Sequence, residues 1–363
     1  MSFYKSIIRP LLFRVPAETA HEFGIKTLES VLSSESARNF IAGKFQCNQF
    51  GEIKRFGLKF KNPLGVAAGF DKNGKVVNQL AALGFGFVEV GTVTFEAQAG
   101  NPTPRLFRLS EDDALINRLG FNNEGTFKVV ERLRKINPAC VLGVNIGKNK
   151  DVPNDAAIEN YLKSFDSVHA VADYVAVNVS SPNTPNLREL QKADALEELL
   201  SALQNRNHEL NLRSKKNLPL LVKIAPDLSE SEIESITDIA SRLNLAGIIA
   251  VNTTVKRENL KTKNVETVGG LSGKPLRARS NEVINRIYKL SKGKLPVVGI
   301  GGIFTAEDAF EKIAAGACLL ESYTGFVYQG ITFARDVNFG LAKILRRKGF
   351  KHLDEAVGSD VKI

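Results

Sequence analysis

Eight short apolar runs, each followed by a helix-sized stretch, constrain the fold of this chain more than any other feature. None of the runs alternates cleanly between apolar and polar residues, which is typical of parallel strands covered on both faces. A capping serine, Ser229, opens one helix-sized stretch, followed by glutamates and then apolar residues at helical spacing. Eight strand–helix units predict an α/β protein with a closed (β/α)8 TIM barrel. The runs span residues 64–68, 85–93, 141–146, 174–179, 218–224, 247–252, 295–300 and 317–323.

A doubly wound parallel sheet is the alternative architecture. Such a sheet normally carries dinucleotide-binding glycines after a strand. Gly299 and Gly301 begin that spacing, but Phe304 occupies the position of the last glycine. Residues 273–275 read Gly-Lys-Pro, which does not match a phosphate-binding P-loop. The barrel is therefore the favoured prediction.

Composition narrows the compartment and the ligand classes. Three cysteines, odd in number and far apart, do not form a disulfide framework, so we expect a reducing compartment. The cysteines and four histidines never cluster at ligand spacing, and we expect no metal. The net charge of +10 indicates either an anionic partner or a solvated basic surface. No nucleic-acid motif accompanies that charge, so nucleic acid is not an expected partner.

The sequence carries no recognisable targeting or spanning segment. No apolar run reaches the roughly 18–20 residues needed to cross a bilayer. The N-terminus has neither the secretory pattern nor that of an Arg- and Ser-rich transit peptide. We therefore expect the mature chain to begin at Met1 and to remain on the cytoplasmic side of a bacterial membrane.

Polar residues and glycines gather at the C-terminal ends of the expected strands, where barrel enzymes place their active sites. Asn145, Asn178 and Asn252 end three of the runs, and Lys223 ends another. One such residue is commonly a structural cap. Eight strand ends with uncharged donors and two lysines, the second being Lys72, instead predict a cavity for a planar anion rich in carbonyls and ring nitrogens.

Motifs at these strand ends resemble those of the dihydroorotate dehydrogenases, in order and over nearly the whole chain. The serine at position 181, with no cysteine near it, resembles the pattern of the membrane-associated, quinone-reducing class 2 enzymes. The soluble relatives, which use fumarate or NAD, have a cysteine there. The motifs include residues 62–74 (NPLGVAAGFDKNG), 117–123 (NRLGFNN), 178–185 (NVSSPNTP), 223–227 (KIAPD), 269–273 (GGLSG) and 323–325 (YTG).

The resemblance implies an activity and a cofactor. It implies oxidation of (S)-dihydroorotate to orotate in pyrimidine (UMP) biosynthesis. One FMN per chain would accept the hydride at N5, and a membrane quinone would be the final electron acceptor. Ser181 would be the base that removes the proton from the ring carbon next to the carbonyl. A serine needs exclusion of water and a proton relay for that task, and Thr184 is the candidate relay.

The resemblance also implies which residues bind each ligand. Lys223 would stabilise negative charge on the reduced flavin. Backbone N–H groups near Gly273, Gly302 and residues 323–324 would hold the FMN phosphate. The implied substrate-binding residues are Lys72, Asn117, Arg118, Leu119, Gly120, Phe121, Asn178, Asn183, Asn252 and Thr253, with the 117–121 loop closing over one side. The implied FMN-binding residues are Ala68, Gly69, Phe70, Asp71, Lys72, Thr92, Asn145, Asn178, Lys223, Val251, Gly273, Gly302, Tyr323 and Thr324.

Three positions depart from the family's pattern. Val251 replaces a frequent Thr, so any contact with the cofactor there must come from the backbone. Asn186 stands where Gly is usual, and we expect the turn to survive because Asn tolerates positive φ. Glu321 stands where Gln is common and adds a negative charge near the eighth strand.

Residues 1–44 are predicted to form two helices ahead of a catalytic barrel domain at residues 45–363. Lys5, Arg9 and Arg14 give the first fourteen residues three positive charges and no negative one, and Pro10 is expected to kink the first helix. Pro16 is expected to start the second helix, whose apolar positions run to residue 32. These helices either pack on the barrel or lie in the membrane interface against lipid phosphates.

The quinone-using class implies that this N-terminal segment forms the entrance to a quinone tunnel, lined by His21, Arg108 and Tyr323. We therefore expect a peripheral protein of the bacterial inner membrane that contacts an anionic lipid surface, as a monomer. Two rival interpretations stay open. One is another FMN barrel oxidoreductase with a different pyrimidine or a soluble acceptor, and the other is a non-catalytic flavin- or phosphate-binding scaffold.

Overall fold

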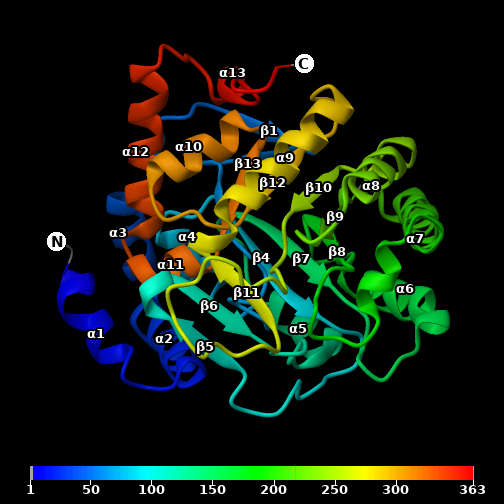
Figure 1. The fold of residues 1–363 in the computed structure, drawn as a ribbon, viewed down its shortest axis with the longest axis horizontal. Coiled ribbons are helices and arrows are strands. Elements are labelled where there is room, and N and C mark those ends of the chain that lie inside the picture. Colours follow the sequence, from blue (N-terminus) through cyan, green and yellow to red (C-terminus); the bar gives the residue numbers. More distant parts are fainter. Residues whose placement is uncertain (1–2, 217, 363) are drawn as a thin grey trace.

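The computed structural model describes residues 3–216 and 218–362, and its centre is a closed barrel of eight parallel strands (Figure 1). Each predicted run forms one barrel strand, with ends within two residues of those expected. The barrel is therefore confirmed, and the doubly wound alternative is wrong. The strands in barrel order are β3 (Leu64–Val66), β4 (Phe87–Val93), β7 (Val141–Ile146), β8 (Tyr174–Asn178), β9 (Leu220–Ile224), β10 (Gly247–Ala250), β12 (Val297–Ile300) and β13 (Leu319–Ser322), and β13 closes the barrel on β3.

An outer ring of helices covers the barrel (Figure 1). The predicted cap at Ser229 is confirmed: its hydroxyl accepts a hydrogen bond from the backbone N–H of Glu232, whose carboxylate accepts one from the Ser229 N–H. The ring helices are α4 (Val77–Ala82), α5 (Gly125–Leu133), α6 (Ala157–Val168), α7 (Ala193–Ser214), α8 (Glu230–Arg242), α9 (Arg277–Ser291), α10 (Ala306–Ala314), α11 (Thr324–Gln329) and α12 (Phe333–Arg347), and α13 (Leu353–Ala356) follows near the C-terminus.

Two small antiparallel sheets supplement the barrel, and neither follows from the apolar runs. A hairpin of β1 (Ile53–Arg55) and β2 (Leu58–Phe60) precedes the first barrel strand. A three-stranded sheet pairs β6 (Ala114–Asn117) with β5 (Leu106–Leu109) and with β11 (Gly270–Gly273). It lies across the end of the barrel at which the strands terminate (Figure 1). Through it, two segments more than 150 residues apart in sequence reach the same cavity.

The N-terminal segment folds into more helices than the two expected. A π-helical turn (η1, Tyr4–Ile8) runs directly into α1 (Arg9–Leu12), followed by α2 (Ala17–Val31) and α3 (Glu35–Phe45). The prediction missed α3, although Ser34 caps it by accepting a hydrogen bond from the Ala37 N–H at 3.1 Å. The change from π to α geometry falls at Arg9, one residue before Pro10, where the kink was expected.

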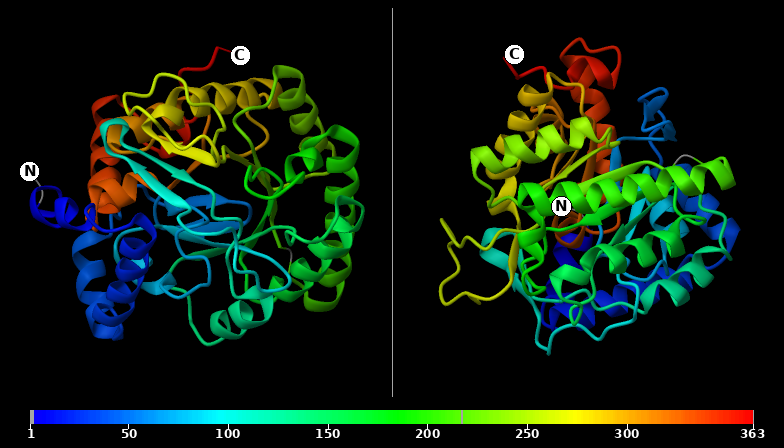
Figure 2. Two further views of the ribbon diagram at one scale, coloured as in Figure 1. Left: turned by 60° about the horizontal axis from the view of Figure 1, so that its bottom comes forward. Right: turned by 90° about the vertical axis from the view of Figure 1, so that its right-hand side faces the viewer.

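The segment packs at one side of the barrel (Figure 2). The helix α2 contacts β5, the turn η1 contacts α11, and α3 contacts α4. The predicted domain boundary after residue 44 falls one residue before the end of α3. Across the described ranges, every helix is too short or too polar to span a membrane.

Candidate active site

A cavity of about 1050 Å³ opens where the barrel strands end. Every barrel strand except β7 sends a residue, or the residues that directly follow it, into its wall. Of the predicted site residues, the wall contains Ala68, Gly69, Lys72, Thr92, Asn117, Leu119, Gly120, Phe121, Asn178, Ser181, Asn183, Lys223, Val251, Asn252, Thr253, Gly273, Gly302, Tyr323 and Thr324.

Ser181 lies in the loop after β8, where its hydroxyl faces the cavity. The residue is only 5% exposed, and its Oγ accepts a hydrogen bond from the backbone N–H of Asn183 at 3.2 Å. Thr184 is also buried, and its Oγ1 has no hydrogen-bond partner among the described residues. A buried hydroxyl of this kind normally acquires a partner from bound ligand or water. The loop turns at Asn186, whose φ of 54° confirms the expected left-handed conformation.

A cluster of amides and a hydroxyl forms the floor of the cavity. Thr92 Oγ1 donates to Asn145 Oδ1 at 2.6 Å and accepts from Asn178 Nδ2 at 2.9 Å. Asn252 Nδ2 donates to Asn178 Oδ1 at 3.3 Å and to Ser180 Oγ at 3.0 Å. These bonds fix the amide orientations across four strand ends. The fixed groups can then offer donors and acceptors to a planar heterocycle without reorganisation.

Lys72 supplies a positive charge at the cavity wall. Burial lowers its pKa to about 8, so the ammonium is only weakly favoured in the absence of an anion. Glu18, the carboxylate with the strongest influence on it, is paired instead with Arg105 at 2.8 Å. A ligand carboxylate beside Lys72 would therefore be its counter-ion.

Asn117 and Asn183 close the opposite side. Asn183 Nδ2 donates to both the backbone O and Oδ1 of Asn117, each at 3.1 Å. This bond ties the 117–121 loop to the loop that carries Ser181. Phe121 in the same loop has a φ of 53° and lines the cavity.

Beneath the floor, Lys223 is buried between two carboxyl groups inside the barrel. Its Nζ lies 3.0 Å from Glu89 Oε1 and 3.5 Å from Glu321 Oε2. Glu89 also accepts hydrogen bonds from Asn145 Nδ2 at 3.0 Å and Tyr174 OH at 3.3 Å. Burial opposes the charge on Lys223, but the two glutamates outweigh it and raise its pKa. The cavity floor thus carries a permanent cation.

Glu321 is the less well satisfied of the two carboxyls. It is fully buried, and its Oε1 lacks a hydrogen-bond partner within the described residues. Burial and the neighbouring Glu89 raise its pKa well above the ordinary value. This shift favours the protonated form of Glu321. It therefore works against the negative charge expected near the eighth strand.

The cavity ends in a tight cradle of backbone near β11 and α11. At Gly273, which has a φ of 101°, a Cβ atom would lie 2.4 Å from the carbonyl oxygen of Asp113. At Gly302, with a φ of 73°, it would lie 2.4 Å from Arg277 Cβ. Only glycine fits either position. Beside them the Thr324 and Ser272 hydroxyls are hydrogen-bonded at 2.8 Å. Closely approaching backbone and two hydroxyls form a site suited to a phosphate group.

A second, largely apolar cavity of about 1540 Å³ lies between the N-terminal helices and the barrel. It is lined by the three predicted quinone-site residues, His21, Arg108 and Tyr323. Burial, and then Lys72, lower the pKa of His21 to about 3, so its imidazole is neutral. Its ring stacks on Tyr323 with 6.3 Å between the centroids. Tyr323 also lines the first cavity, as do Leu106 and Leu115, so these side chains lie between the two spaces.

Comparison with known proteins agrees with this geometry. The family model described as dihydroorotate dehydrogenase matches residues 52–345. The chain belongs to the dihydroorotate dehydrogenase family. A relative from Christiangramia forsetii, named dihydroorotate dehydrogenase (quinone), is 50% identical, with 92% of this chain and 97% of the relative covered. A relative of the same name from Gloeobacter violaceus is 49% identical, with 99% of each chain covered.

A solved family member has the same fold. The crystal structure of DHODH from Eimeria tenella in complex with ferulenol matches with a TM-score of 0.83 and 38% identity. The match covers 92% of this chain and 98% of that one.

Four predicted dihydroorotate dehydrogenase site residues lie just outside the wall of the first cavity. Phe70 turns toward the second cavity and lines it. Asp71 accepts backbone N–H bonds from residues 73, 75 and 76 and so holds the loop after β3. Asn145 lies under Thr92, and Arg118 turns to Glu266, 3.2 Å away. The prediction missed Leu106 and Leu115, which line both cavities from the unpredicted antiparallel sheet.

Proposed function

We propose that this chain oxidises dihydroorotate to orotate, with FMN as the resident hydride acceptor and a membrane quinone as the final electron acceptor. The observation that carries the proposal is a pair of cavities separated by Tyr323 in a chain of the dihydroorotate dehydrogenase family. One cavity is lined by amides, hydroxyls and two lysines, and the other is lined mainly by apolar side chains. Together they suit a polar electron donor and an apolar acceptor.

The residues present fit FMN. The cradle at Gly273, Gly302 and Thr324 would hold its phosphate, and Ala68, Gly69 and Thr92 would lie against the ring system. Lys223 would stabilise the negative charge of the reduced ring, because Glu89 and Glu321 raise its pKa and keep it protonated. When bound, FMN supplies the acceptor for a hydride and passes two electrons on.

The chain's own residues would orient the substrate and take its proton. Lys72 would bind the dihydroorotate carboxylate, while Asn117, Asn178, Asn183 and Asn252 would match its ring carbonyls and N–H groups. Ser181 would accept the proton from the ring carbon next to the carbonyl, since its hydroxyl is shielded from water. The unpartnered hydroxyl of Thr184, three residues further on, supports its assignment as the proton relay.

The second cavity would admit the quinone. Its neutral His21 and its apolar lining favour an uncharged ring, and Arg108 offers one cation toward the oxygen that gains charge. Phe13 stacks under Arg108, with 4.6 Å from the guanidinium carbon to the ring centroid. Two electrons from dihydroorotate and two protons convert the quinone to a quinol, which balances the reaction.

The N-terminal helices would bring this cavity to a membrane surface. Eight of the thirteen large apolar side chains that are exposed in the described residues fall in the first forty positions. Among them Phe3 is 68%, Leu11 59% and Phe23 60% exposed. Such a density of exposed apolar groups next to Lys5, Arg9 and Arg14 is typical of an interfacial segment. We propose peripheral binding to anionic lipid through these helices.

The test is an anaerobic absorbance spectrum of the FMN-loaded protein. Dihydroorotate is expected to bleach the flavin bands, and a short-chain ubiquinone added afterwards is expected to restore them. A flavin that dihydroorotate leaves oxidised would refute the substrate. A bleached flavin that fumarate or NAD restores, but ubiquinone does not, would refute the acceptor.

A further inference from the structure

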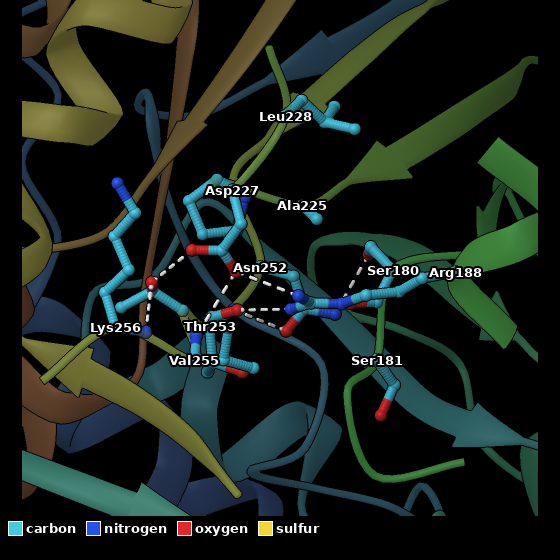
Figure 3. Close-up of polar contacts among 12 residues, drawn as sticks. Ser180, Ser181, Arg188, Ala225, Asp227, Leu228, Asn252, Thr253, Val255 and Lys256 are labelled. Carbon is cyan, nitrogen blue, oxygen red and sulfur yellow. Dashed lines mark hydrogen bonds and ion pairs between the residues drawn. The ribbon is translucent and has the colours of Figure 1, made fainter. Parts of the chain in front are cut away.

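One arginine outside the cavity wall connects the segments that follow three barrel strands, β8, β9 and β10. Arg188 lies in the short 3-10 helix η4 (Leu187–Gln191), just after the Ser181 loop. Its Nε donates to the backbone O of Ser180 at 3.0 Å, and its Nη2 donates to the backbone O of Thr253 at 2.9 Å. The third nitrogen, Nη1, pairs with Asp227 Oδ2 at 2.8 Å (Figure 3).

Asp227 extends this connection to the segment after β10. Its carboxylate accepts hydrogen bonds from the Thr254 hydroxyl and from the Val255 N–H, the latter at 3.2 Å. The carboxylate therefore holds both Arg188 and residues 254–255. The side chains of Arg188 and Asp227 are 24% and 16% exposed. Both side chains are mostly shielded from solvent, and every nitrogen of the guanidinium makes a hydrogen bond. This ion pair is therefore held more rigidly than an ordinary ion pair on the surface.

The backbone carbonyls that accept hydrogen bonds from Arg188 lie in or next to proposed site residues. Ser180 precedes Ser181, and Thr253 lies in the cavity wall beside Asn252. The Ser181 hydroxyl points away from the guanidinium in Figure 3, so Arg188 does not reach the reacting atoms. Its contacts act on the backbone that carries them.

We propose that Arg188 and Asp227 are positioning residues that set the distance between the Ser181 base and the substrate-binding segment Asn252–Thr253. The proposal rests on the function proposed above. A planar guanidinium can hold two carbonyls and a carboxylate in one geometry, which a lysine cannot do. Displacing a reacting group by about 1 Å can cost roughly 100-fold in rate. Loss of the pair should therefore slow removal of the substrate proton without touching FMN or the quinone cavity.

The test compares Arg188→Ala, Arg188→Lys and Asp227→Asn in the FMN-loaded, full-length enzyme. Stopped-flow absorbance gives the rate of flavin reduction by dihydroorotate and, separately, the rate of reoxidation by a short-chain ubiquinone. Substrate deuterated at the carbon next to the carbonyl reports on proton removal. The matched control is Arg206→Ala, because Arg206 also pairs with an aspartate, Asp166, in this case through two nitrogens and on the helical surface.

Arg188→Ala is expected to slow reduction by about 10- to 100-fold and to increase the isotope effect at that carbon, with reoxidation unchanged. Asp227→Asn should resemble it, Arg188→Lys should be intermediate, and Arg206→Ala should match the parent enzyme. Partial unfolding would lower the amplitude of bleaching but leave the isotope effect unaltered. If Arg188→Ala does not fold, the other two variants carry the same expectation.

Two results would overturn the proposal. One is reduction at the parental rate in the Arg188 and Asp227 variants, which leaves the proposed function intact. The other is equal slowing of both half-reactions with an unaltered isotope effect, which would mark the pair as merely structural. If dihydroorotate does not bleach the flavin of the parent enzyme, the proposed function is refuted, and the positioning role is refuted with it.

Discussion

The buried carboxyl of Glu321 is expected to contribute a pH dependence of stability that is opposite in sign to that of most carboxyls, and Glu321→Gln is expected to remove that contribution. Most carboxyls in folded proteins have lowered pKa values and stabilise the fold as pH rises. Glu321 behaves in the opposite way. Its ordinary pKa is 4.5, and burial, together with Glu89, raises it well above that value in the folded chain.

Above pH 4.5 the unfolded chain releases this proton while the folded chain keeps it. The unfolded state then binds fewer protons, so the free energy of unfolding falls as pH rises toward the folded pKa. One such group gives a slope of about 1.4 kcal/mol per pH unit over that window. Lys223, whose pKa is raised, contributes stability that is fully present below its ordinary pKa of 10.5, so it adds no slope near neutral pH.

Glutamine keeps the size of the side chain, mimics the protonated acid and cannot titrate. Urea denaturation at pH 5 to 8, with the free FMN concentration held fixed at each pH, measures the effect. The unfolding free energy of Glu321→Gln minus that of the parent should grow as pH rises from about 4.5 toward the raised pKa of Glu321, by at most about 1.4 kcal/mol per pH unit. The control is Glu258→Gln, at a carboxyl that is 72% exposed, and its unfolding free energy plotted against pH should run parallel to that of the parent. Parallel curves for Glu321→Gln as well would refute the buried-proton assignment.

Three further outcomes follow from the site and the N-terminal helices. Ser181→Ala should retain FMN and reoxidise normally with quinone, but reduce its flavin about 10²- to 10⁴-fold more slowly in stopped flow; an unchanged rate would contradict the base assignment. Dihydroorotate affinity, measured by flavin absorbance titration, should weaken as pH rises above the Lys72 pKa of about 8, and Lys72→Gln should bind weakly at every pH. Leu11→Glu should reduce sedimentation with anionic vesicles, whereas Phe127→Glu, at a residue that is 81% exposed and far from the N-terminus in sequence, should not.

The sequence predicted the barrel because parallel strands covered on both faces leave a continuous apolar signature. All five residues of β9 are buried, for example, and its apolar run is visible without any partner. The antiparallel β5, β6 and β11 have no such signature. Each has four residues, and β11 is Gly-Leu-Ser-Gly, so its place as a strand comes from its register with β6, 157 residues away at Ser272 and Leu115.

The same distinction separates the predicted site residues from the missed ones. Ser181 and Lys223 are recognisable because each lies in a contiguous motif at a strand end. Arg188 and Asp227 lie 39 positions apart, and no spacing rule relates them, because their contact depends on the closure of the barrel. The helix α3 is a different case, since the Ser34 cap was present in the sequence but was not used as a helix start after the apolar positions that end at residue 32.

The two cavities divide the charges of the site in a way that matches the two half-reactions. The first cavity holds lysines at its wall and floor, Lys72 and Lys223, so a dianionic or carboxylated ligand is stabilised there. The second is lined mainly by apolar side chains, with a histidine that burial keeps neutral and with Arg108, Arg335 and Asp336, so it suits an uncharged ring. Tyr323 lies on the boundary, with its pKa raised by burial, and therefore stays a neutral phenol. A polar donor in the first cavity and an apolar acceptor in the second would thus be kept apart by electrostatics as well as by shape.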